Sequence, residues 1–193
     1  MRTKDTTHHK SDNLRAVVSR RCALESTVII RNYVKASDLQ GCALLLRELT
    51  EWHAEMYQRP AKAWGPIETD YDRDLDTLDP SLFWVAVHNS KIIGLVGLLL
   101  HENGDEAEVE PIMVTREFRG KGIGERLLET AVAEARLRRS KLVFIKHLAR
   151  NIETIQFSYK HGFTNIGYIE LLMDLSERSR KPGPRMFGRD FNM

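Results

Sequence analysis

The chain has 193 residues, of which 42% are hydrophobic and 29% charged, so it can form one domain with a sizeable core and is not a wholly disordered protein. Its net charge of +2 is distributed unevenly, with +3 in residues 1–27, +3 in residues 177–193 and −4 between them. Because each basic excess is small, no nucleic-acid partner is expected.

The N-terminal residues 1–26 are polar and charged, which predicts a basic, flexible extension. This stretch lacks the apolar core of a signal peptide, and no segment approaches the roughly 20 apolar residues that span a bilayer. A cytoplasmic protein without a membrane partner is therefore expected. The two cysteines, Cys22 and Cys42, have no metal-ligand or disulfide-framework spacing, so no metal site is expected.

The first predicted elements are a strand over residues 28–34 and a helix after it. The strand is β-branched, and Ser37 or Asp38 can cap a helix whose apolar residues recur at intervals of three and four. This helix can continue to Tyr57. The region 48–79 is acidic and aromatic, and its prolines and glycine predict a long loop after the helix.

Three antiparallel strands are predicted within residues 82–114. Short polar turns at 88–91 and 102–105 separate them, and the second turn contains the Asn-Gly signal of a β-hairpin. In the third strand, over 106–114, Pro111 cannot donate a hydrogen bond to a ladder. This strand therefore predicts a bulge or a break in pairing at Pro111.

A turn with three alternate glycines connects the third strand to a helix over residues 125–136. Glycines allow a tight bend and leave the N–H groups unobstructed, and a helix start has N–H groups without intrahelical acceptors. With the helix dipole, such a turn suits a diphosphate, and the side chains of Arg119 and Lys121 would add mobile cations. The spacing and the lack of a following acid disfavour a Rossmann turn, and the lack of Gly-Lys-Ser/Thr excludes a P-loop. A tight turn without a ligand remains the alternative.

The last predicted elements are a strand over 141–148, a helix capped by Asn151 and ended by Gly162, and a closing strand over 168–175. The folded domain is expected over 27–176, followed by a basic tail over 177–193. This order of elements predicts an α/β (α+β) fold with a mixed, mostly antiparallel central sheet flanked by helices.

The turn has the pattern R-x-x-G-x-G after a strand that ends Met-Val-Thr, and Asn151 is followed eleven residues later by Gly162-Phe163. Over about residues 28–175 the chain resembles the GNAT superfamily of acyl-CoA-dependent N-acyltransferases. The resemblance implies acetyl-CoA as co-substrate, a sheet splayed at the CoA-binding strand, and Asn151 in contact with the cofactor arm. It also implies a set of cofactor-binding residues: Ile112, Met113 and Val114 for the pantetheine arm, and the backbone of Arg119, Gly120, Lys121, Gly122, Ile123 and Gly124 for the diphosphate.

Acetyl transfer needs an unprotonated amine, so a carboxylate base is expected. Glu106, Glu108 and Glu110 share one face of their strand, and the resemblance implies Glu110 as the base, with Glu108 second. Solvated acids on an exposed face remain the alternative. Many relatives have a tyrosine acid where this chain has Ser158, and here tyrosine follows at Tyr159.

A shift of one residue rotates a helical side chain by about 100°. Tyr159 is therefore expected to pack in the core while Ser158 faces the thioester, unless Tyr159 reaches round. By resemblance, the N–H of Val114 is the oxyanion donor. His147 and His161 flank the second helix and can titrate near neutrality, and His161 suits a helix C-terminus.

These features predict an N-acetyltransferase that works by direct attack in a ternary complex, since no Cys or Ser stands in a nucleophile elbow. The acceptor would be a small amine or a protein or peptide amine. A catalytically weak acyl-CoA-binding regulatory module is the alternative, because Ser158 replaces the expected tyrosine. The resemblance is compatible with a homodimer.

Overall fold

The computed structural model describes residues 27–58, 75, 79–102, 104–173, 175 and 181–192. The predicted N-terminal extension and most of the predicted loop after Tyr57 lie outside these residues. No helix in the described part of the chain is long and apolar enough to cross a bilayer.

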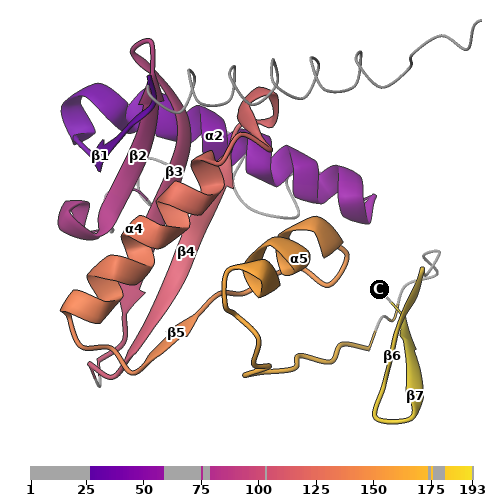
Figure 1. Ribbon diagram of the computed structural model, residues 1–193. Helices are drawn as coiled ribbons and strands as arrows, with labels where there is room; N and C mark the ends of the chain where they lie inside the picture. The colour runs from indigo at the N-terminus through magenta and orange to yellow at the C-terminus, as the bar shows by residue number, and fades with distance from the viewer. Residues whose placement is uncertain are drawn as a thin grey trace, which may run out of the picture.

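A five-stranded sheet forms the centre of the molecule, in the order β1-β2-β3-β4-β5 (Figure 1). The first four strands are antiparallel, and β5 pairs with β4 in parallel. This agrees with the predicted mixed, mostly antiparallel sheet. The strands are β1 (Ile29–Asn32), β2 (Phe83–His88), β3 (Lys91–Leu100), β4 (Glu106–Val114) and β5 (Leu142–Phe144).

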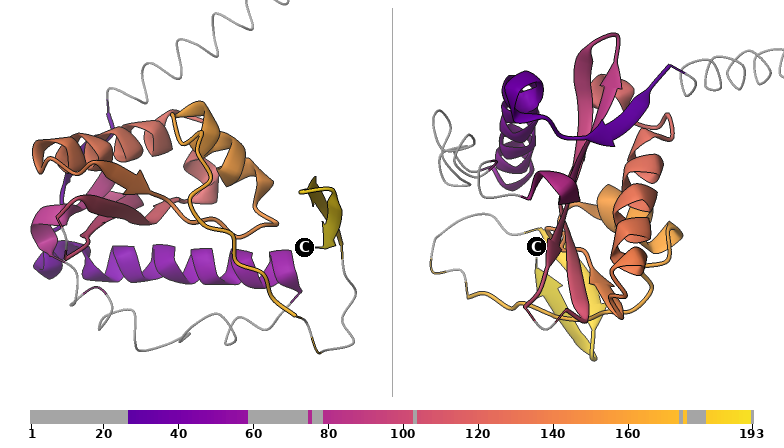
Figure 2. Two further views of the ribbon diagram at one scale, coloured as in Figure 1. Left: turned by 90° about the horizontal axis from the view of Figure 1, so that it is seen from below. Right: turned by 90° about the vertical axis from the view of Figure 1, so that its left-hand side faces the viewer.

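Helices cover both faces of the sheet (Figure 2). Helix α2 (Lys35–Tyr57) packs on one face, where Cys42 and Leu45 join an apolar cluster with alternate residues of β2 and β3. Helices α4 (Ile123–Leu137) and α5 (Ile152–Lys160) lie on the other face, and the apolar stripe of α4 is buried there. Burial raises the pKa of the Cys42 thiol to about 12, so this cysteine packs as an apolar residue. Two short 3₁₀ helices, η2 (Pro80–Leu82) and η3 (Arg116–Phe118), connect elements.

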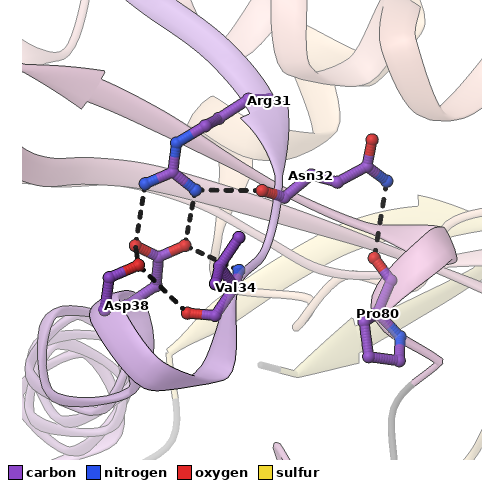
Figure 3. A network of polar contacts seen from close by, with 6 residues as sticks. Arg31, Asn32, Val34, Asp38 and Pro80 are labelled. Atoms are coloured by element: carbon purple, nitrogen blue, oxygen red, sulfur yellow. Dashed lines mark hydrogen bonds and ion pairs between the residues drawn. The ribbon is translucent and has the colours of Figure 1, made fainter.

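The start of α2 differs from its prediction. The helix begins at Lys35, and Asp38 lies in its first turn instead of capping it. Its carboxylate accepts a bond of 2.8 Å from the N–H of Val34 and bonds of 2.6 and 2.8 Å from the guanidinium of Arg31 (Figure 3). Asp38 therefore satisfies the helix start by reaching back, which joins α2 to β1.

A bulge in β4 confirms the interpretation of Pro111. Val96 pairs with Ile112 and Leu98 with Val109, so both Glu110 and Pro111 stand opposite Gly97. A Cβ at Gly97 would collide with the carbonyl oxygen of Glu110. The absence of a side chain at Gly97 is what lets the bulge form.

Strand β5 is shorter than predicted. It pairs with β4 only from Glu106 to Glu108, opposite residues 142–144, whereas β4 continues to Val114. Residues 145–148 were predicted to extend β5, but they leave the sheet. The sheet is therefore splayed between β4 and β5, as the resemblance implied.

The predicted closing strand over 168–175 is wrong for the residues that the structure describes there. Residues 168–173 form no strand, and most of their apolar side chains are exposed. The chain passes the end of β5, where the Tyr168 ring lies 5.9 Å from that of Phe144, and then leaves the edge of the sheet. Strand β5 ends at Phe144, so it offers residues 168–173 no long edge to pair with. The tail instead contains a hairpin of β6 (Pro182–Met186) and β7 (Arg189–Asn192).

Candidate active site

The glycine turn before α4 has the backbone conformation that its glycines predicted. Gly120 and Gly122 have φ of +71° and +80°, which other residues adopt only with strain, and Gly122 is the N-cap of α4. Within the described part of the chain, the N–H groups of residues 120–124 have no hydrogen-bond acceptor, whereas that of Arg119 bonds the carbonyl of Arg116 at 3.3 Å. The turn thus presents a set of open donors at a helix N-terminus.

The side chain of Arg119 is not the mobile cation that the sequence suggested. Its Nε–H donates to the carbonyl of Val114 at 2.9 Å, its guanidinium lies 4.7 Å above the ring of Trp52, and Nη2 is 3.6 Å from Glu48. Glu48 also accepts bonds from the Thr115 hydroxyl at 2.7 Å and the Arg116 N–H at 2.9 Å. Arg119 and Glu48 therefore fasten the turn to α2.

Strand β4 directs two of its three predicted pantetheine-binding residues toward the splay. The N–H of Thr115 donates to the carbonyl of Ile93 at 2.9 Å, which fixes the alternation of ladder bonds between β3 and β4. By that alternation Met113 exchanges hydrogen bonds with Leu95, whereas Ile112 and Val114 turn their N–H and C=O groups away from β3. The carbonyl oxygen of Val114 accepts the bond from Arg119. The N–H of Val114 is therefore the backbone group of that residue that remains open toward the gap between β4 and β5.

Met113 is the predicted cofactor residue that does not reach this gap. Its backbone is used by β3, and its side chain is buried in the α2-side cluster.

Two of the predicted carboxylates lie together on β4. Glu108 is 4% exposed, and its Oε2 accepts a bond of 2.8 Å from the Nζ of Lys146, while its Oε1 has no partner among the described residues. Glu110 lies at the bulge. Desolvation raises the pKa of the Glu110 carboxyl, and the charge of Glu108 adds to the rise, while Lys146 opposes it. A carboxyl group with a raised pKa is better suited to accept a proton near neutral pH.

Helix α5 carries the remaining predicted residues. Asn151 is its N-cap, since Oδ1 accepts a bond of 3.3 Å from the N–H of Thr154, and Gly162 ends the helix with φ of +99°. The Asn151 side chain is buried with its Oδ1 used, so its Nδ2 donors are the groups that could contact a ligand.

The structure distinguishes Ser158 from Tyr159. Ser158 is 3% exposed, and its Oγ lies 2.7 Å from the Nε2 of His147, whereas Tyr159 is 65% exposed. The expectation that Tyr159 packs in the core is therefore wrong. Burial lowers the pKa of His147, which keeps its ring neutral at physiological pH.

Lys146 was not predicted from the sequence, and His147 was expected only to flank the second helix, without Ser158 as its partner. Successive residues of an extended segment point to opposite sides, and here Lys146 contacts Glu108 while His147 contacts Ser158. That alternation was visible in the sequence, but the partners were not. Among the described residues, no cluster of potential ligands could hold a metal ion.

Residues 46–163 match the sequence profile described as "Acetyltransferase (GNAT) family". N-acetylaspartate synthetase of Xenopus tropicalis is 29% identical over 90 residues, which cover 47% of this chain and 33% of that protein. Streptothricin acetyltransferase of Escherichia coli is 27% identical over 129 residues, or 66% of this chain and 73% of that protein. The chain spans about a third of the length of the N-acetylaspartate synthetases that it matches.

A solved structure gives the same fold. N-acetylglutamate synthase from Neisseria gonorrhoeae, complexed with coenzyme A and N-acetyl-glutamate, superposes with a TM-score of 0.52 and 21% identity, over 70% of this chain and 28% of that one.

Proposed function

Because the chain belongs to the GNAT family of acetyltransferases, we propose that it transfers an acetyl group from acetyl-CoA to a primary amine by direct attack in a ternary complex. The observation that carries this proposal is the glycine turn, whose open N–H groups at residues 120–124 adjoin the splay between β4 and β5. These donors suit the diphosphate of coenzyme A, and the free edge of β4 at Ile112 and Val114 suits its amide-containing arm.

When bound, acetyl-CoA supplies an activated acetyl thioester. Glu110 accepts the proton of the attacking amine, directly or through a water molecule, and Glu108 with Lys146 sets the charge around it. The N–H of Val114 donates to the negative charge that develops on the carbonyl oxygen. Asn151 donates from Nδ2 to the cofactor arm.

The acceptor amine binds on the face of the sheet that α2 covers, because Glu108 and Glu110 lie on this face and α4 lies on the other. Before it reacts, an alkylamine is protonated and positively charged, and acidic residues favour its binding. The two relatives above are named for an N-acetylated amino acid and for streptothricin, so a small-molecule amine is the first acceptor class to test and a protein or peptide amine the second.

The test has two parts. Thiol release from acetyl-CoA is measured against a panel of amino acids, polyamines, aminoglycosides and peptides, and calorimetry measures binding of coenzyme A. The variant Gly122→Glu is expected to lose that binding, because a side chain fills the turn and its charge repels the diphosphate. Gly104→Glu is the matched control, because Gly104 also has a positive φ of 70° but lies in the hairpin turn before β4.

Equal affinity of Gly122→Glu and Gly104→Glu for coenzyme A would refute this placement of the diphosphate. Tight binding of coenzyme A without transfer to any acceptor would instead favour a regulatory module that binds acyl-CoA, as the replacement of the expected tyrosine by Ser158 suggested.

A further inference from the structure

The segment between β4 and the glycine turn is fixed by a side chain of α2. Both carboxylate oxygens of Glu48 are used there: Oε2 accepts a bond of 2.7 Å from the Thr115 hydroxyl, and Oε1 accepts a bond of 2.9 Å from the Arg116 N–H. Helix α2 covers one face of the sheet, and α4, which follows the turn, covers the other (Figure 2). Glu48 therefore connects α2 to the backbone that leads into the turn on the opposite face.

Arg119, the residue before the first glycine of the turn, is held by the backbone and by α2. Its Nε–H donates to the carbonyl of Val114 at 2.9 Å, its guanidinium lies 4.7 Å above the ring of Trp52, and its Nη2 is 3.6 Å from Oε1 of Glu48. Glu48 and Trp52 are four residues apart, so they lie on the same side of the helix. One side of α2 thus fixes the orientation of the guanidinium.

The segment that α2 holds leads directly into the open donors of the turn, the N–H groups of residues 120–124. A loop that presents such donors binds an anion more tightly when its backbone is already ordered. Ordering the backbone of a single residue on binding costs roughly a 5- to 30-fold loss of affinity. Contacts that fix residues 115–119 therefore favour binding of a diphosphate without touching it.

The two cations of the turn have different surroundings. The ammonium of Lys121 lies 4.7 Å from the centre of the Phe118 ring. The guanidinium of Arg119 lies over a ring too, but it also faces the carboxylate of Glu48, whose negative charge offsets its own. Of these two side chains, Lys121 is therefore better suited to attract a diphosphate by its charge.

We infer, on the basis of the proposed function, that Glu48 and Trp52 are positioning residues for the diphosphate turn. Through Arg119 they keep residues 115–119 ordered, so that the N–H groups of residues 120–124 are preorganised for the diphosphate of coenzyme A. Arg119 acts through its planar shape and its hydrogen bond, and not as a charge on the ligand. The affinity for the cofactor is thus set in part by α2, which covers the acceptor face of the sheet.

Variants of α2 test the positioning role by calorimetry. Glu48→Ala and Trp52→Leu are each expected to weaken binding of coenzyme A roughly 10-fold, and the loss should appear in KM for acetyl-CoA and not in kcat. Binding of pantetheine, which lacks the diphosphate, should change less than about twofold. Trp52→Phe retains a ring under the guanidinium and should stay within about threefold. Glu51→Ala is the matched control, because Glu51 lies on the same helix and is exposed.

Variants of Arg119 separate its position from its charge. Arg119→Lys keeps the charge but loses the planar group, so it should weaken binding of coenzyme A about as much as Glu48→Ala. Because both residues act through the same contacts, the double variant should be no weaker than either single variant. Between ionic strengths of about 0.05 and 0.5 M, the affinity of Arg119→Gln should fall as steeply as that of the unmodified protein, whereas that of Lys121→Gln should fall less.

Three results would overturn the inference and leave the acetyltransferase proposal intact. They are equal or tighter binding of coenzyme A by Glu48→Ala, full affinity of Arg119→Lys, and equal losses for coenzyme A and pantetheine with a lower melting temperature, as a general structural role would give. Should Glu48→Ala fail to fold, Trp52→Leu and Arg119→Lys decide between the two roles. If the unmodified protein does not bind coenzyme A, the proposed function itself fails, and the inference with it.

Discussion

Glu108 and Glu110 differ in how firmly the protein holds them. The carboxylate of Glu108 is buried and bonded to Lys146, so it cannot easily approach a substrate. Glu110 lies at the bulge, where much of the residue is exposed but its carboxyl group is partly buried, and this partial burial raises the pKa of the carboxyl group. Desolvation, together with the charge of Glu108, therefore favours Glu110 as the group that takes up a proton.

Glu110→Gln is expected to lower kcat about 100-fold, within the usual range for loss of a general base. The base works in its ionised form, so the activity of the unmodified protein should rise with pH through a pKa above the ordinary value of 4.5. This acidic limb should be absent in the variant. Rates measured between pH 4.5 and pH 8 check both expectations.

Glu106→Gln is the matched control for the base. Glu106 shares the strand and its face, but it lies at the paired end of β4, opposite Leu142. It should stay within about twofold of the unmodified protein, the effect of a remote surface substitution. If Glu108→Gln removes the acidic limb and Glu110→Gln does not, the base is Glu108.

Asp38 gives a stability prediction. Hydrogen bonds from Arg31 hold the pKa of this carboxyl below its ordinary value of 3.8 in spite of its burial. The stabilisation is present above pH 3.8 and is lost as the pH falls through the lowered pKa of the folded state. Asp38→Asn should therefore lower the free energy of unfolding by about 2 kcal/mol at pH 7, and by progressively less as the pH falls below 3.8.

Urea unfolding at pH 7 and at a series of acidic pH values measures this effect. Asp105→Asn is the control. Both side chains of the Asp105–Lys141 ion pair are exposed, so this pair should contribute less than about 1 kcal/mol to the free energy of unfolding. A penalty for Asp38→Asn that stays constant down to pH 2.5 would contradict the linkage to its carboxyl group.

At the residue scale, the sequence predicted features that depend on local chemistry. Asn151 caps α5, Gly162 ends it and Pro111 lies in a bulge, because each residue type determines its own backbone. The ion pair of Arg119 with Glu48 and its cation–π contact with Trp52 could not be predicted, because these residues are about seventy positions apart in the sequence.

At the scale of elements, periodicity located the helices and the three-stranded meander but not where a ladder ends. Strand β5 has a strong apolar pattern, and so does the segment after α5, yet pattern alone cannot show whether a free edge is available. Because β5 ends after three residues, the segment that resembled a closing strand has no long partner.

Hydrogen exchange tests this arrangement. Within the described residues, the N–H groups of 168–173 have no backbone acceptor, so their amides should exchange almost as fast as those of an unfolded chain. The amides of Leu95 in β3 and of Met113 in β4 should be among the most protected, because they pair in the centre of the sheet. Protection of residues 168–173 comparable to that of β4 would show that they pair with an edge in solution.

At the scale of the whole molecule, the sheet separates two kinds of chemistry. Helix α2 covers one side, and α4 and α5 cover the other (Figure 2). The carboxylates of β4 belong to the α2 side, because Ala107 and Val109, which alternate with them, are buried in the cluster under α4. Lys146 and His147 connect the two sides through consecutive residues at the splay. A ligand lodged between β4 and β5 would therefore contact both halves of the core.

Such a ligand should stabilise the whole domain. At a coenzyme A concentration of 100 times Kd, binding to the folded state adds about 2.7 kcal/mol, and a domain of this size should gain roughly 5 to 10 °C in melting temperature. Pantetheine at equal concentration lacks the diphosphate and should give a much smaller shift, and Gly122→Glu should abolish the shift with coenzyme A but not the fold. Equal shifts with pantetheine and coenzyme A would mean that the amides of residues 120–124 do not bind the diphosphate.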